Sequence, residues 1–130
     1  MWEVSDQEFA AVTALPAPRR YDYFAKKLAD WQRLWSLGDE AGFVAAADDD
    51  GRDLLPVWPH PAFAAACATG DWEGQEPVEI TLDEWLTEIL PMLERDGTRI
   101  AVFQTPQGQA VHVDPERLRH DLEEELSQYS

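Results

Sequence analysis

The sequence predicts an α+β fold, with a single mostly antiparallel or mixed sheet and about five helices packed on it. Three observations support this fold class. Hydrophobic residues recur at helical spacing near both ends of the chain, short apolar runs lie between them, and clusters of Gly, Asp and Pro separate the runs. The chain has 130 residues, 45% of them hydrophobic, and no linker long enough to divide it. We therefore expect a single domain over residues 1–130.

Two helices are predicted near the N-terminus. Ser5 is a suitable N-cap and Glu8 can complete a capping box, so the first helix begins there. It should end near Leu15, because two prolines follow. A second helix is predicted over residues 19–35. Its hydrophobic residues recur every three or four positions and form one stripe: Tyr21, Phe24, Leu28, Trp31 and Trp35.

The middle of the chain predicts short strands joined by turns. An apolar run at residues 43–47 is followed by an acidic turn, and residues 54–58 form the antiparallel return strand. Pro56 cannot donate a backbone hydrogen bond, so it favours an edge position or a bulge for this strand. A short helix is predicted over residues 61–69, and an edge strand over residues 78–80.

The second half predicts a helix, a hairpin and a final helix. Thr81 is the expected N-cap of the first of these helices, and Glu84 is its capping-box partner. Pro91 removes a donor within that helix, so we expect a kink or a break at Leu90. The remaining expected elements are hairpin strands at residues 100–103 and 111–113 and a last helix that starts after Asp114.

Charge narrows the range of partners. The chain has 26 acidic and 10 basic residues, for a net charge of −16. Acids and bases balance over residues 1–35, so the whole negative excess follows Trp35. A field of this sign repels phosphate, so we expect no nucleic-acid partner and no anionic membrane surface. A basic protein partner is compatible with it, and solubility alone is the simpler interpretation.

Cellular location and cysteine usage give one expectation each. The N-terminus carries no targeting pattern and the chain has no long apolar span, so a cytoplasmic protein is expected. Cys67 is the single cysteine, which rules out an internal disulfide. It lies in an apolar helical run, where inert packing is the default for a free thiol.

The most distinctive stretch is a proline-rich corner at residues 54–63. Three prolines within six residues stiffen the backbone and remove three donors. The corner carries Trp58 and His60, either for recognition or to end a strand and start a helix. Trp58 and Trp72, the latter in an acidic loop, are aromatic residues without a clear place in the core, and aromatic residues are enriched at interfaces.

Metal and catalytic patterns are weak. The acidic run at residues 48–53 fails the calcium-loop pattern at both ends, so a solvated turn is the better interpretation. The histidines lack zinc-ligand spacing, and no second cysteine joins Cys67. We therefore expect no metal and no cofactor. A Cys67–His60 nucleophile pair is conceivable, but the prolines beside His60 make the geometry unfavourable.

Two function hypotheses follow. The first is a small, acidic, non-catalytic protein–protein interaction module, of adaptor or immunity type. The alternative is an enzyme or small-ligand-binding protein with a pocket near His60, Cys67 and Trp72. A homodimer that pairs exposed aromatic residues is a third alternative. The candidate binding residues are Trp58, His60, Cys67 and Trp72, and no catalytic residue is assigned.

The chain also resembles a known bacterial family, domain of unknown function 2750. The resemblance spans residues 18–130 and is carried by short stretches at 21–24, 26–27, 30–31, 55–61, 66–70, 82–86, 101–106 and 115–118. It implies a small bacterial cytoplasmic protein, and it supplies no catalytic residues. A looser similarity, at the level of the order of elements, links the chain to the N-terminal domain of the enhanced-serine-sensitivity proteins.

Overall fold

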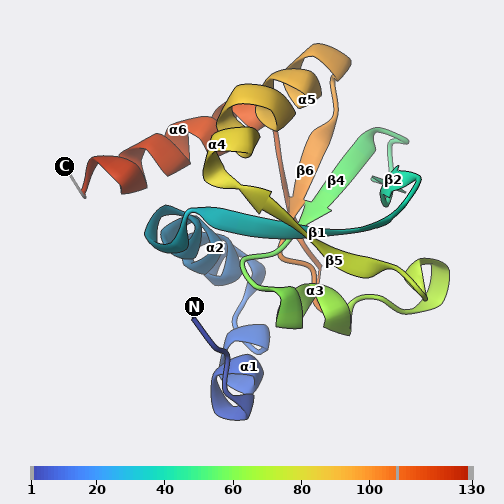
Figure 1. The fold of residues 1–130 in the computed structure, drawn as a ribbon, viewed down its shortest axis with the longest axis vertical. Coiled ribbons are helices and arrows are strands. Elements are labelled where there is room, and N and C mark those ends of the chain that lie inside the picture. Colours follow the sequence, from blue (N-terminus) through green and yellow to red (C-terminus); the bar gives the residue numbers. More distant parts are fainter. Residues whose placement is uncertain (1, 108, 129–130) are drawn as a thin grey trace.

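The computed structural model describes residues 2–107 and 109–128. Helical elements are α1 (Asp6–Thr13), α2 (Ala17–Trp31), α3 (Pro61–Ala66), the 3₁₀ turn η1 (Gly70–Trp72), α4 (Leu82–Glu84), the π-helical turn η2 (Trp85–Ile89), α5 (Leu90–Asp96) and α6 (Pro115–Ser127) (Figure 1). Strands are β1 (Arg33–Asp39), β2 (Gly42–Phe43), β3 (Ala46–Ala47), β4 (Asp53–Val57), β5 (Glu76–Thr81), β6 (Arg99–Val102) and β7 (Val111–Val113). The α+β class is thereby confirmed. Because α4, η2 and α5 follow one another without a break and count as one helix, the described part has five helices.

The strands form two sheets, so the prediction of a single sheet was wrong. One sheet has the order β2-β1-β5 with antiparallel neighbours. The other has the order β3-β4-β6-β7, in which β4 and β6 run parallel. In the described residues the sheets share one isolated backbone pair, Trp35 with Trp58, where β1 and β4 cross (Figure 1). Alternation of residues predicts strands but not their partners, and β1 pairs along its length with β5 instead.

The second helix is shorter than its hydrophobic stripe predicted. It ends at Trp31, and Gln32 adopts the left-handed conformation with φ 58°. Strand β1 then starts at Arg33, so Trp35 lies in a strand opposite Glu79 rather than on the helix. Six residue pairs between β1 and β5 override the local helical pattern here.

Pro56 lies in a strand with neighbours on both sides, so an edge position was wrong for β4 as a whole. However, β3 pairs with β4 at Leu54 and Asp53. The short β3 therefore stops before Pro56, and no neighbour on that side requires the missing N–H. The Pro56 carbonyl accepts a hydrogen bond of 2.7 Å from Ser36 Oγ.

Ser5 and Thr81 cap their helices as predicted, Asp114 occupies an N-cap position without a side-chain capping bond, and Pro91 lies where its helix is interrupted. The Thr81–Glu84 capping box forms, and Ser5 Oγ accepts from the Glu8 N–H at 3.1 Å. Pro91 was expected to kink or break the helix at Leu90. The α-helical pattern is interrupted at this place: the π-helical turn η2 precedes Leu90, and α5 begins at Leu90 with Pro91 in its first turn.

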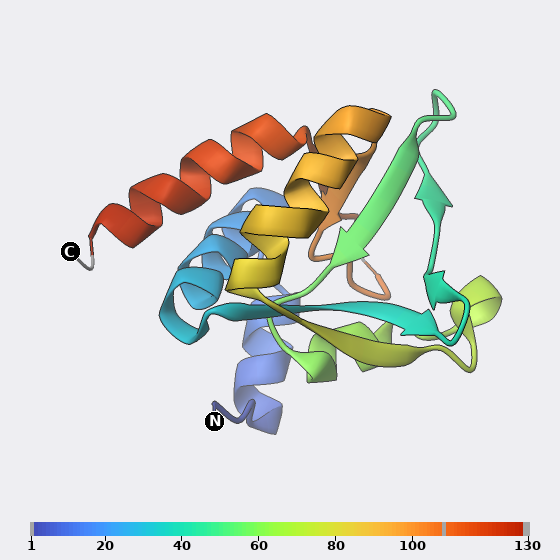
Figure 2. The same ribbon diagram turned by 45° about the horizontal axis from the view of Figure 1, so that its top comes forward.

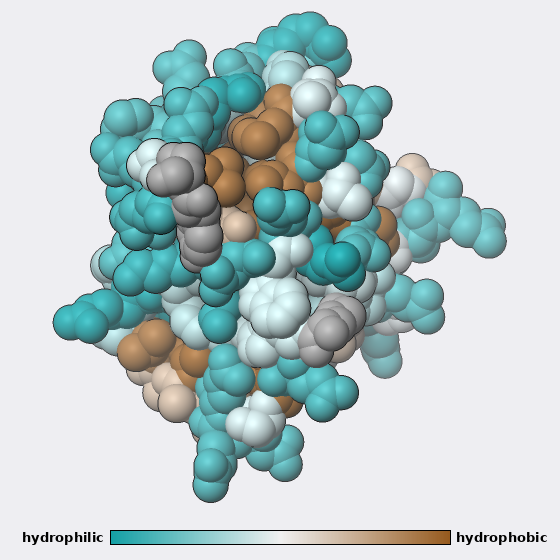
Figure 3. Space-filling view, turned by 60° about the vertical axis from the view of Figure 1, so that its left-hand side comes forward, coloured by the Kyte–Doolittle hydropathy of each residue, from teal (hydrophilic) through white to brown (hydrophobic). Residues whose placement is uncertain are grey.

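Buried side chains from both sheets and from the helices form one hydrophobic cluster. Its largest fully buried members are aromatic: Trp58, Trp85, Phe24, Phe63 and Phe103. Helix α2 packs against α6 and contacts β1, β6 and β7, while α3 contacts β1 and β5. One face of the exterior is mostly hydrophilic, with hydrophobic side chains visible between the polar ones (Figure 3). In the described part, no helix is both long and apolar enough to cross a bilayer.

Candidate functional site

Three adjoining hollows follow the chain from the end of β1 to the turn after β3. The central hollow, of about 420 Å³, is lined by residues 45–47 on one side and by Cys67, Trp72 and Gln104 on the other. A hollow of about 300 Å³ shares Ala45 and Trp72 with it, and one of about 400 Å³ shares Ala47 and Gln104. We call these three hollows the groove. The chain from β2 to β3 runs along this side, next to the loop that carries η1 (Figure 2).

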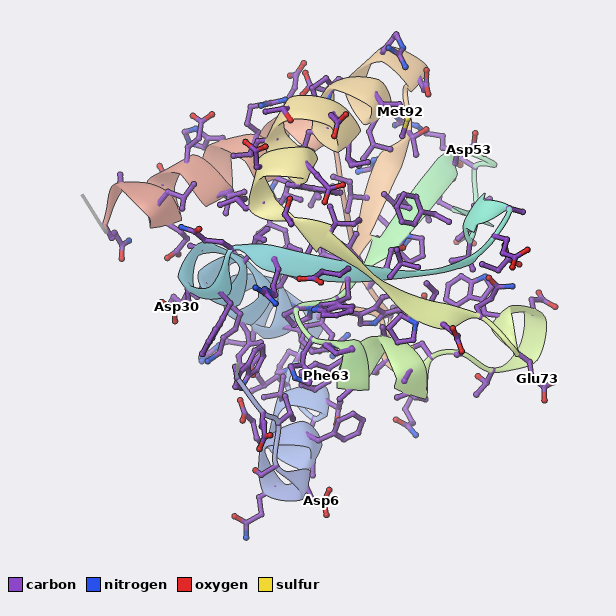
Figure 4. All side chains as sticks on the ribbon, viewed as in Figure 1. Asp6, Asp30, Asp53, Phe63, Glu73 and Met92 are labelled. Atoms are coloured by element: carbon purple, nitrogen blue, oxygen red, sulfur yellow. The ribbon has the colours of Figure 1, made fainter. Side chains whose placement is uncertain are left out.

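The groove is acidic along its whole length. Its aspartates are distributed over the three hollows: Asp39 at one end, Asp71 in the middle, and Asp48, Asp49 and Asp50 at the other end. Asp53 and Glu73 lie on the same side of the molecule as β2 (Figure 4). Among the described lining residues, the one Lys or Arg is Arg99, and it is paired with Asp48 at 3.9 Å and Asp114 at 3.2 Å. The groove therefore presents a net negative field.

Two of these carboxylates are fixed by local hydrogen bonds. Asp39 accepts from Gln75 Nε2 and from the Ala41 N–H, and these bonds lower the pKa of Asp39. Asp48 accepts from the N–H groups of Arg52 and Asp50, and the first of these is the main reason that the pKa of Asp48 is lowered. The acidic run at residues 48–51 is thus a hydrogen-bonded turn, as the sequence indicated.

Three of the four predicted site residues meet at the base of the groove. The backbone carbonyl of Gln104 accepts from Trp58 Nε1 at 2.8 Å and from Cys67 Sγ at 3.3 Å. The Trp72 ring stands edge-on to Trp58, with centroids 6.3 Å apart. Trp58 is 0% exposed and lies beneath the groove, whereas Cys67 and the half-buried Trp72 line it.

His60 lies apart from the groove, at the other end of α3 from Cys67. Its Nδ1 accepts from the Ala62 N–H at 3.0 Å and so caps the helix. Because Nδ1 is an acceptor, Nε2 carries the proton and donates to the Trp2 carbonyl at 3.1 Å. Burial lowers the pKa of His60. The conceivable Cys67–His60 pair is therefore not assembled.

Cys67 is not set up as a nucleophile. The side chain is 5% exposed, and its Sγ donates to the Gln104 carbonyl. Burial raises the pKa of Cys67 to about 11, and the nearby Trp58 N–H and Arg20 guanidinium offset this only in part. A reactive cysteine needs a lowered pKa and an adjacent base. At neutral pH this thiol stays protonated.

Residues 21–122 match the family described as "Protein of unknown function (DUF2750)". The chain belongs to this family. The resemblance noted in the sequence is thereby confirmed, and the DUF2750 match includes every described residue that lines the groove. No curated protein matches the chain closely enough to count as a relative.

Sequence reasoning missed three residues that shape the groove: Arg20, Phe103 and Gln104. Arg20 entered the sequence analysis only through the charge balance of residues 1–35, yet it is a buried residue, 4% exposed. Phe103 was assigned to a strand, yet it adopts φ 60° beyond the end of β6. Gln104 acts through its backbone carbonyl, which every residue has, so its residue type does not indicate this role. The flanking Pro106 was the one available signal of a specialised loop.

A fourth hollow lies between α2 and α6, with a volume of about 480 Å³. Three of its polar side chains, Tyr21, Arg117 and Asp121, contact one another. Tyr21 donates its hydroxyl to Asp121 Oδ2, and the Arg117 guanidinium lies 5.3 Å from the Tyr21 ring centroid. In the described residues no three His, Cys, Asp or Glu side chains gather as metal ligands. The groove along β2 and β3 is therefore the better candidate site.

Proposed function

We propose that this protein is a non-catalytic interaction module that binds a basic, extended segment of a partner protein in the groove. The observation that carries the proposal is the charge of the groove. Five aspartates line it, and the one guanidinium among its described residues is already paired. A lysine- or arginine-rich segment offers the complementary charge.

The shape of the groove supports an extended ligand. The hollows lie in a row along residues 39–50, and β3 pairs with β4 on one side while it lines the central hollow on the other. An extended peptide next to an edge strand is a common recognition mode. Trp72 adds an aromatic surface in the central hollow, against which a lysine or arginine side chain can pack.

The enzyme alternative receives less support. It needs His60, Cys67 and Trp72 around one pocket, but His60 hydrogen-bonds Trp2 and Ala62 at the far end of α3. Cys67 is buried and holds its proton at neutral pH. A small-ligand pocket also gains little support, because such pockets are lined mainly by apolar groups with a few polar ones, whereas five aspartates are spread along this groove.

The test is binding of a fluorescent deca-arginine peptide, followed by anisotropy at low and high salt. The groove variant combines Asp49→Asn, Asp50→Asn and Asp71→Asn, and leaves Asp48 to hold its turn. The matched control removes the same number of exposed acids outside the groove: Glu88→Gln, Glu116→Gln and Glu123→Gln. Three exposed charge pairs together amount to about 1.4 kcal/mol, so we expect about tenfold weaker binding.

The control variant should bind within about threefold of the wild type, since distant exposed charges are screened by salt. Equal losses in the groove and control variants would mean that only net charge attracts the peptide. That result, or no binding to the wild type, would refute the proposal. Sedimentation at several protein concentrations, run in parallel, separates the homodimer alternative from a monomeric module.

A further inference from the structure

We propose that Arg20 is a positioning residue for the groove. Its guanidinium holds the segment of residues 103–107, the wall that faces β3, in a conformation that this backbone would not otherwise keep. Gln104 and Pro106 of this wall line the central hollow. The inference rests on the proposed function for what the groove binds, whereas the structural role of Arg20 can be tested without any ligand.

Arg20 binds backbone carbonyls from two separate parts of the chain. Its Nε donates to the Phe103 carbonyl at 3.0 Å. Its two terminal nitrogens donate to the carbonyls of Leu15 and Gln109. A buried guanidinium is costly unless its donors are satisfied, and here each nitrogen has a carbonyl partner. The side chain therefore ties the turn between α1 and α2 to the loop between β6 and β7.

Phe103 is the strained residue of this wall. It adopts φ 60°, a region that a bulky side chain rarely occupies, although it is fully buried. Its ring packs against Phe63, with centroids 4.7 Å apart, and its N–H donates to the Val57 carbonyl at 2.9 Å. Strain of this kind persists only where the surroundings determine the conformation, and it is found most often at functional sites.

The next residue connects this strain to the groove. The left-handed turn at Phe103 precedes Gln104, whose carbonyl meets Trp58 Nε1 and Cys67 Sγ. Donors thus hold two successive carbonyls of the wall, Arg20 on the first and the pair Trp58 and Cys67 on the second. If the hydrogen bonds of Arg20 to this segment break, the wall can relax, and the hydrogen bond from Cys67 Sγ to the Gln104 carbonyl is lost as well. The single cysteine of the chain is therefore a built-in reporter of the wall.

The first test measures thiol labelling of Cys67 under native conditions, alongside urea unfolding, in the wild type and in Arg20→Lys. Lysine keeps the charge but cannot reach three carbonyls at once. The matched control is Leu93→Ala, a core truncation in α5. The Cys67 labelling rates of the two variants are compared at urea concentrations that give both proteins the same free energy of unfolding. We expect Arg20→Lys to label at least about tenfold faster than the control, because its opening is local. Equal rates would overturn the inference.

A measurement on the unmodified chain covers the case that Arg20→Lys fails to fold. Exchange of the Arg20 Nε proton, followed by NMR, and labelling of Cys67 should report the same opening equilibrium within about threefold. Both should exceed the equilibrium constant of global unfolding. Two unrelated openings, or two that both equal global unfolding, would show that Arg20 and the wall do not form a local unit.

The deca-arginine peptide separates this inference from the proposed function. If the peptide binds the wild type, Arg20→Lys should weaken binding by at least about fivefold while the protein remains folded. Equal affinity in the two proteins overturns the positioning role, even if labelling accelerates. If the wild type binds no peptide, the proposed function fails, and Cys67 labelling still decides whether Arg20 holds the wall.

Discussion

Trp35 and Trp58 exchange two backbone hydrogen bonds: the Trp35 N–H donates to the Trp58 carbonyl at 2.8 Å, and the Trp58 N–H donates to the Trp35 carbonyl at 2.7 Å. This pair joins the two sheets, because Trp58 directly follows the end of β4 and pairs with Trp35 of β1. Trp58 then turns into the proline corner, and its indole supports the base of the groove. The crossing point and the candidate site therefore depend on the same residue.

A hydroxyl beside this crossing should be important for stability. Ser36 is fully buried, and its Oγ donates to the Pro56 carbonyl. Ser36→Ala removes this donor and should lower the free energy of unfolding by about 1–3 kcal/mol. Thr87→Ala is the control, since its exposed hydroxyl also donates to a backbone carbonyl, that of Asp83. Urea unfolding should place the control within about 0.5 kcal/mol of the wild type, and an equal effect at both sites would contradict the prediction.

The hairpin at one end of the groove requires glycine at position 38. A Cβ on Gly38 would lie 2.7 Å from the Gly42 carbonyl oxygen, so the backbone would have to move. Gly38→Ala should therefore cost about 1–3 kcal/mol of unfolding free energy. Gly97→Ala, at the open C-cap of α5 with φ 70°, should cost about 1–2 kcal/mol from backbone conformation alone. Gly38→Ala should in addition weaken peptide binding, which anisotropy would detect, while Gly97→Ala, outside the groove, should not.

His60 should make stability depend on pH. Burial lowers the pKa of His60, so the folded chain keeps the ring neutral to lower pH than the unfolded chain does. The unfolded state then binds more protons, and stability present above a pH of about 6.5 is lost progressively as the pH falls. His60→Asn keeps an N-cap acceptor but cannot titrate. Between pH 7.5 and 5.5, the free energy of unfolding measured in urea should fall less for His60→Asn than for the wild type. Equal falls in the two proteins would contradict the prediction that His60 causes the pH dependence.

The Cys67 thiol should react slowly in the folded protein. With a pKa of about 11, its thiolate fraction at pH 8 is about two hundredfold below that of an ordinary cysteine, before burial is considered. Labelling with a disulfide reagent should therefore be at least about a hundredfold faster in denaturant than in buffer. A rapid native reaction with one equivalent would instead revive the nucleophile hypothesis.

Local signals in the sequence predicted most elements but not their assembly. Ser5 and Thr81 cap helices through hydrogen bonds that span only three residues, and Asp114 occupies an N-cap position without such a bond. The end of α2 was misplaced because Trp31 and Trp35 continue a helical stripe, while pairing with β5 draws Trp35 into a strand. The division into two sheets follows from pairings between distant segments, β1 with β5 and β4 with β6, which no local pattern encodes.

The candidate site was predictable only in part. Trp72 and Cys67 were selected for residue type, and both line the groove. His60 was grouped with them because it is close in sequence, but α3 separates it from Cys67. Arg20 and Gln104 escaped notice because their roles depend on backbone carbonyls far away in the chain.

Residues of both sheets line the groove: β2 of the first sheet at one end, and β3 of the second sheet further along. A peptide segment long enough to fill all three hollows would contact both sheets and hold them together across their junction. Peptide binding should therefore stabilise the whole fold. The melting temperature should climb with peptide concentration, and the β2 hairpin should resist proteolysis in step with the rest of the chain.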